Sequence, residues 1–217
     1  MEVVALDPTG QAALQRLAVD LRGVFGDRLE SIVAYGSGRP LHTLALVERL
    51  TFQDLAACVP LVERWHGDEL ATPLLLSRRE FLRTLDVFPV EYGAIIDSHV
   101  VVVGSDPFAG CAVCDADLRR AVELQAKSHL IHLREGYLDV NGRPDGVARL
   151  IAGSAPAYRA LVRNLESLAP EAVNEASRRL QNELETMNTI AEPSALFVRY
   201  LAEVERIWGF VDAWRDR

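Results

Sequence analysis

Two apolar runs on either side of a glycine-rich turn are the feature that most limits how this chain folds. The first run, residues 30–35, leads into Tyr35-Gly36-Ser37-Gly38, and the second covers residues 43–47. Short apolar runs bounded by glycine and proline are typical of buried strands. The sequence therefore predicts two neighbouring strands joined by a short turn.

The rest of the first half alternates helical and strand-like patterns. Thr51 is a typical N-cap, Ser77 and Glu80 have the spacing of a capping box, and Pro60 is expected to kink the helix that follows Thr51. Predicted helices cover residues 8–25, 52–65 and 78–85, and predicted strands cover residues 30–35, 43–47, 74–76 and 100–103. This order indicates an α/β (α+β) fold with a small mixed sheet.

The second half has no strand-like run. Its composition changes at Asp106-Pro107-Phe108-Ala109-Gly110, which we interpret as a linker. Predicted helices cover residues 115–138, 145–167, 170–188 and 194–214. Four helices with short loops indicate an all-α antiparallel bundle, so we expect two domains, residues 1–108 and 109–217.

Composition limits the class of protein. The chain has 217 residues, of which 49% are hydrophobic and 25% charged, as in an ordinary globular protein. A formal net charge of −8 repels phosphate backbones and disfavours nucleic-acid binding. There is no apolar run of roughly 20 residues, no signal peptide and no set of paired cysteines. We therefore expect a cytoplasmic protein without a membrane partner.

The order of these parts resembles the nucleotidyltransferase-like superfamily with a C-terminal helical bundle. Kanamycin nucleotidyltransferase and the minimal nucleotidyltransferases of bacterial toxin–antitoxin pairs have this arrangement. The resemblance rests on the turn at Tyr35-Gly36-Ser37, on segments 88–92 and 100–107, and on the helix of residues 124–137, and it covers the chain to about residue 167. It implies a ligand site in a cleft between the two domains.

The resemblance assigns roles to the residues around the turn. In the family, the Gly-Ser amides and the Ser hydroxyl hold nucleotide phosphates, and Gly36 and Ser37 match them. The family's next strand carries Asp-x-Asp, which binds two magnesium ions, whereas His42 and Leu44 stand here. A third carboxylate belongs on the strand that aligns with residues 73–76, which has none. Because Mg²⁺ requires oxygen ligands, we expect degenerate metal positions, no metal and no cofactor.

Arg39 follows the Gly-Ser-Gly turn directly. A guanidinium there could replace the positive charge of a metal ion beside a phosphate. The alternative is a solvated turn residue before Pro40. We expect Gly36, Ser37 and Arg39 to form a remnant nucleotide- or anion-binding site.

Three functions remain open at this point. The first, which we favour, is a catalytically degenerate nucleotidyltransferase-like protein, a pseudoenzyme that binds a nucleotide or another small molecule. The second is an active nucleotidyltransferase with relocated carboxylates, for which Asp68, Glu69 and Glu91 are the candidates. The third is an antitoxin-like or structural interaction module in which apolar side chains fill the former cleft. A leucine in a metal position disfavours the second.

Two sequence patterns with metal-ligand spacing have simpler structural interpretations. His129, His132 and Glu135 follow one another at intervals of three and could bind a transition metal, but no further ligands can be named. We interpret them as part of an amphipathic helix. The CxxC of residues 111–114 has no second cysteine pair and is interpreted as plain linker.

Glu91, Asp97 and His99 are a candidate general acid–base cluster, with surface residues around a hairpin as the alternative. The last predicted helix carries large apolar groups that we expect to be core or dimer contacts rather than a base-stacking platform. They are Phe197, Tyr200, Trp208, Phe210 and Trp214. Their number leads us to expect a homodimer.

Overall fold

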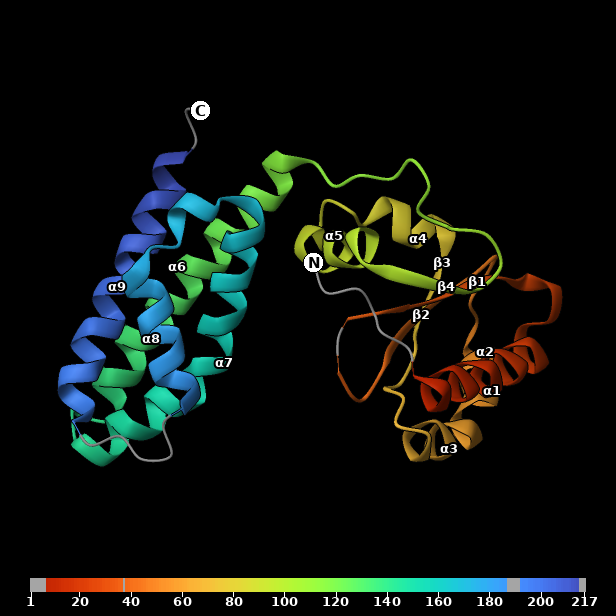
Figure 1. Cartoon of the computed structure of the whole chain (residues 1–217), viewed down its shortest axis with the longest axis horizontal. Helices are drawn as coiled ribbons and strands as arrows, with labels where there is room; N and C mark the ends of the chain where they lie inside the picture. Colours follow the sequence, from red (N-terminus) through yellow and green to blue (C-terminus); the bar gives the residue numbers. More distant parts are fainter. Residues whose placement is uncertain (1–6, 37, 187–191, 215–217) are drawn as a thin grey trace. The chain divides into compact units, whose positions relative to one another are not determined.

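The computed structural model describes residues 7–36, 38–186 and 192–214, and the chain divides into two compact units (Figure 1). The first unit ends at Cys114 and the second begins at Asp115. The predicted linker begins earlier, but Phe108 is buried against Phe81, with ring centroids 4.9 Å apart. The segment after the last strand therefore packs with the first unit. Among the described helices, none is long and apolar enough to cross a membrane.

A four-stranded mixed sheet forms the centre of the first unit. Its strands are β1 (Leu29–Tyr35), β2 (His42–Val47), β3 (Leu74–Ser77) and β4 (His99–Val103). The order across the sheet is β3-β2-β1-β4, with β2 antiparallel to β1, β1 antiparallel to β4, and β2 parallel to β3. The small mixed sheet predicted from the sequence is thus confirmed.

One face of the sheet is covered by α1 (Pro8–Phe25), α2 (Phe52–Cys58) and α3 (Val62–Gly67) (Figure 1). Asp7 caps α1 by accepting a hydrogen bond from the Gly10 amide at 2.6 Å. Thr51 begins α2 with a capping box, and Pro60 lies in the 3₁₀ turn that separates α2 from α3. The predicted kink is therefore a short break between two helices.

The other face of the sheet is covered by α4 (Arg78–Arg83) and α5 (Pro89–Asp97). Ser77 and Glu80 form the predicted capping box of α4. The helix α5 was not predicted, and the interpretation of this segment as a hairpin was wrong. Pro89 occupies the first turn of α5, where its missing N–H costs nothing, and Tyr92 and Ile95 bury one side of the helix against the sheet.

The second unit contains the predicted helical bundle. Its helices α6 (Asp115–Asp139), α7 (Pro144–Leu168), α8 (Glu175–Thr186) and α9 (Pro193–Ala213) alternate in direction (Figure 1). The helix α8 begins later than predicted, because Pro170–Ala172 form a 3₁₀ turn. Asn174 and Ser177 then exchange capping hydrogen bonds: the Ser177 amide donates to Asn174 Oδ1 at 3.0 Å and the Asn174 amide to Ser177 Oγ at 3.2 Å.

Candidate functional site

The turn after β1 and the start of β2 lie side by side at one end of the sheet. Tyr35 pairs with His42 across the two strands, and Val33 pairs with Leu44. Because side chains alternate between the faces of a strand, these four residues lie on the face that α4 and α5 cover. Gly36 has a φ of +77°, a conformation that favours glycine. Ser37 lies outside the described residues.

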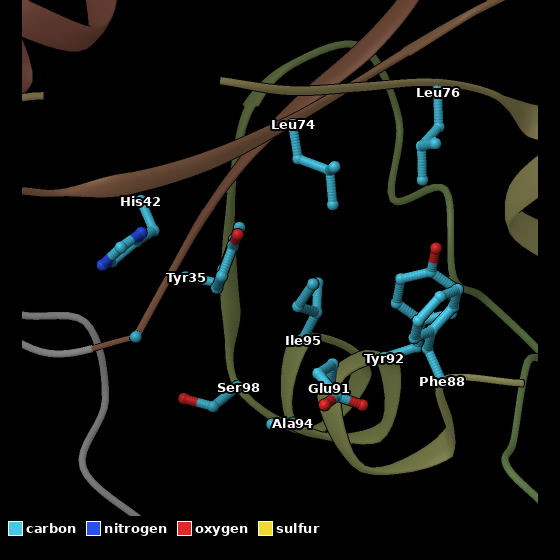
Figure 2. A pocket seen from close by; sticks show the side chains of 11 residues that line it. Tyr35, His42, Leu74, Leu76, Phe88, Glu91, Tyr92, Ala94, Ile95 and Ser98 are labelled. Atoms are coloured by element: carbon cyan, nitrogen blue, oxygen red, sulfur yellow. The ribbon is translucent and has the colours of Figure 1, made fainter. Parts of the chain in front are cut away.

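A pocket of about 850 Å³ opens on this face of the first unit, between the sheet and α5 (Figure 2). Figure 2 shows Leu74 and Leu76 of β3 on one side, opposite Ile95, Tyr92 and Phe88. The volume is in the range of pockets that hold small organic ligands. The complete wall consists of Tyr35, Gly36, His42, Leu74, Leu76, Phe88, Glu91, Tyr92, Ala94, Ile95 and Ser98.

The two residues at the predicted metal positions have different surroundings. His42 is exposed and lines the pocket, with its ring centroid 5.7 Å from that of Tyr35. Leu44 has no exposed surface and packs in the core with Val33 and Phe81. One imidazole and one buried aliphatic side chain do not match the oxygen ligands that Mg²⁺ requires. In the described ranges, no group of three His, Cys, Asp or Glu side chains could hold a metal ion.

Of the three candidate relocated carboxylates, only Glu91 reaches the pocket. Asp68 accepts two hydrogen bonds from the Arg16 guanidinium, each of 2.8 Å. Glu69 lies 3.2 Å from Arg39 in an ion pair. A single carboxylate and a single imidazole cannot supply the ligands of a two-metal site.

Arg39 is held by carboxylates and does not line the pocket. Its Nη2 donates to Asp7 Oδ1 at 2.8 Å, and its Nη1 pairs with Glu69. The Gly10 amide and, to a smaller extent, Arg39 lower the pKa of Asp7. A phosphate at Arg39 would have to compete with both carboxylates. The role of Gly36, Ser37 and Arg39 in anion binding stays a prediction.

The pocket wall is apolar and aromatic, with few polar groups. Burial, and to a smaller extent Tyr92, raises the pKa of Tyr35, so this phenol is neutral at physiological pH. The Tyr92 hydroxyl lies 3.4 Å from Thr84 Oγ1. Glu91 is exposed on α5 and is the only carboxylate among the pocket residues, which include no lysine or arginine.

The candidate acid–base cluster does not assemble. Glu91 lines the pocket, whereas His99 Nδ1 lies 3.0 Å from the Ile95 carbonyl oxygen and His99 Nε2 lies 3.2 Å from Asp106 Oδ1. Asp97 is exposed at the end of α5 and is not among the pocket residues. The three side chains therefore share a segment of chain but no site.

The two histidines of α6 differ in burial. His129 is buried, with Nε2 2.8 Å from the Tyr200 hydroxyl, while His132 is exposed and its Nδ1 lies 3.6 Å from Glu135. Burial, and to a smaller extent the neighbouring His132, lowers the pKa of His129 to about 4. This arrangement favours the interpretation as part of an amphipathic helix. The cysteines at positions 111 and 114 are both free.

The aromatic groups of α9 divide between the inside and the surface of the bundle. Phe197 and Tyr200 are buried, and Phe197 stacks on Tyr137 with centroids 4.8 Å apart. Trp208 is partly buried, and Lys127 Nζ lies over its ring, 3.5 Å from the ring centroid. Two of the five groups that suggested a homodimer thus serve the bundle itself.

Sequence reasoning missed the pocket residues on α5 and directly beside it, apart from Glu91. Phe88, Ala94 and Ser98 line the pocket because a helix crosses this face of the sheet. Two signals could have revealed that helix. Proline stands at position 89, and Phe88, Tyr92 and Ile95 have helical spacing.

The fold defines an α/β protein with a small mixed sheet, followed by a helical second unit. No protein-family model matches the sequence, and no curated protein matches it. A crystal structure of the spectinomycin adenyltransferase AAD(9) from Enterococcus faecialis with ATP and spectinomycin is similar to this chain, with a TM-score of 0.49 and 11% sequence identity. The match covers 90% of this chain and 98% of that chain.

Proposed function

We propose that this chain is a catalytically degenerate nucleotidyltransferase-like protein whose first unit binds a small organic molecule. The observation that carries the proposal is the wall of the pocket. The strand positions at which the resemblance expects metal-binding carboxylates hold His42 and Leu44, and the neighbouring strand presents Leu74 and Leu76. The site therefore suits an apolar ligand better than two magnesium ions and a triphosphate.

The alternative of an active enzyme is weakened by the surroundings of the relocated acids. Asp68 and Glu69 pair with arginines outside the pocket, which leaves Glu91 alone. The alternative of a pure interaction module is weakened by the open volume of about 850 Å³. Because all the residues that line this pocket belong to the first unit, the proposal does not depend on a cleft between the units.

The absence of catalysis is tested by incubating the chain with labelled ATP, GTP, CTP or UTP, magnesium, and aminoglycosides or hydroxylated proteins as acceptors. We expect no transfer of nucleotide. Transfer that disappears with EDTA would overturn the degenerate assignment and favour the active enzyme.

Ligand binding is tested with Nile red, an uncharged apolar dye whose fluorescence rises in apolar surroundings. We expect saturable fluorescence with the full chain and its loss in Ala94→Trp, because Ala94 is exposed on α5 and lines the pocket. Ala57→Trp is the matched control, since Ala57 is an exposed helical alanine on the opposite side of the sheet. A signal that survives Ala94→Trp, or no signal in the unaltered chain, would contradict the proposal.

A further inference from the structure

The charges around the pocket select among small molecules. Its lining includes one carboxylate, Glu91, and no lysine or arginine. The guanidinium of Arg39, which follows the turn at Gly36, is paired with Asp7 and Glu69. A ligand with a phosphate or carboxylate group would thus enter an apolar pocket whose described lining offers it one repelling carboxylate and, as its one basic side chain, the imidazole of His42.

Glu91 is available to a ligand. It is exposed on the first turn of α5, and no hydrogen bond or ion pair joins it to another side chain in the described part of the chain. Figure 2 shows its carboxylate beside Ala94 on the α5 side of the pocket. A carboxylate at the edge of an apolar pocket is suited to an ammonium group, which keeps part of its hydration there.

Aromatic rings add a second attraction for a cation. Phe88, which directly precedes α5, and Tyr92 on α5 lie next to each other, with centroids 5.6 Å apart, and Tyr35 contributes a third ring to the wall. Aromatic faces attract cations within about 6 Å of the ring centroid. The net charge of −8 for the whole chain also favours the approach of a cation.

The apolar walls define the body of the ligand. Leu74 and Leu76 face Ile95 across the pocket (Figure 2). A polyhydroxylated or multiply charged ligand would lose its hydration against these side chains without replacement hydrogen bonds. Burial of a flat or branched hydrocarbon body against the same side chains makes the free energy of binding more favourable.

We infer that the pocket binds an organic monocation, an amine with an aromatic or aliphatic body, whose ammonium group pairs with Glu91. This inference rests on the proposed function, because it concerns the ligand of the same pocket. It goes further by assigning the ligand's charge, its apolar body and the residue that recognises the charge.

Three indole derivatives of similar size separate charge from apolar contact. They are tryptamine, which is cationic at pH 7, tryptophol, which is neutral, and indole-3-propionate, which is anionic. We expect calorimetric titration of the full chain at pH 7 to give a Kd for tryptamine about 3- to 10-fold lower than for tryptophol. The propionate should bind more weakly than tryptophol, and 0.5 M NaCl should reduce the advantage of tryptamine.

Glu91→Gln keeps the shape of the side chain and removes its charge. We expect the tryptamine Kd in this variant to rise toward that of tryptophol, with the tryptophol Kd unchanged and only the smaller preference from the aromatic rings left. Glu63→Gln is the matched control, because Glu63 is exposed on α3 at the opposite face of the sheet, and it should alter neither value.

Failure of this inference can be told apart from failure of the proposed function. If Nile red binds and Ala94→Trp removes it, the pocket binds ligands. Equal affinity for tryptamine and tryptophol, no tryptamine binding, tightest binding of the propionate, or an equal effect of Glu91→Gln on both ligands would then overturn the inference alone. Absence of specific Nile red binding would overturn both.

Discussion

Protonation of His129 should destabilise the helical bundle as the pH falls. His129 on α6 contacts two aromatic residues: the Tyr200 hydroxyl of α9 lies 2.8 Å from its Nε2, and the Tyr158 ring of α7 lies 6.4 Å away between centroids. Burial, with a smaller effect of His132, lowers its pKa from the usual value near 6.5 to about 4. Between these values the unfolded chain binds a proton that the folded chain does not.

The sign and size of the effect follow from this difference. Stability is fully present above the unfolded pKa and is lost as the pH falls toward the folded pKa, because protons then bind the unfolded chain preferentially. Each tenfold difference in proton affinity corresponds to about 1.4 kcal/mol. The single group should therefore cost about 2 kcal/mol of stability at pH 5 and about 3 kcal/mol at pH 4 relative to pH 7.

The measurement is native-state hydrogen exchange of peptides from α6 and α9 in the full chain at pH 7 and pH 5, corrected for intrinsic exchange rates. In His129→Gln, whose amide can still bond the Tyr200 hydroxyl, this loss of about 2 kcal/mol should disappear even if the variant is less stable at pH 7. The matched control His132→Gln, at an exposed position on the same helix, should keep the loss. An equal loss in the unaltered chain and in His129→Gln would refute the reasoning.

Four other predictions concern stability and assembly. Leu44→Asp places an unpaired carboxylate where no side-chain surface is exposed, so urea unfolding should show a free energy of unfolding lower by at least about 3 kcal/mol. Calorimetry should show no gain of magnesium binding. A variant as stable as the unaltered chain would contradict this prediction. Gly104→Ala should lower the stability by about 2 kcal/mol or more, because φ is +81° and a Cβ would lie 2.3 Å from the Glu30 carbonyl oxygen. Gly23→Ala, in open space on α1, should instead raise it by about 0.5–1 kcal/mol. The homodimer through α9 stays a prediction that sedimentation equilibrium can test, and a mass near 24.0 kDa at all micromolar concentrations would contradict it.

Local signals explain why most of the fold could be predicted. Asp7 and Pro8 mark the start of α1, and Gly26 with a φ of +56° marks its end. The capping boxes at Thr51 and Ser77 determine the starts of α2 and α4 through hydrogen bonds within three residues of the chain. Interactions of this range are visible in the sequence itself.

The helix α5 and the pocket depend on contacts that are distant in sequence. The segment 89–97 is short and mixes Val90, Tyr92, Ile95 and Ile96 with a glycine, so its pattern resembles a strand as much as a helix. Its helical form buries Tyr92 and Ile95 against Leu44 and Leu46 of a strand more than 40 residues earlier. The helix α5 lines the pocket because it packs on the sheet in this way. The spacing of apolar residues along the sequence does not predict that packing.

Leu74 and Leu76 belong to β3, one of the two edge strands of the described sheet, where it pairs with β2. The pairings of β1 with β2 and β4, which hold the centre of the first unit, involve neither leucine. Substitutions at these two positions can therefore reshape the pocket without altering the hydrogen-bonded pairing of the central strands. Such a separation lets descendants of this chain acquire new ligand preferences through one or two changes, without first having to evolve a different architecture.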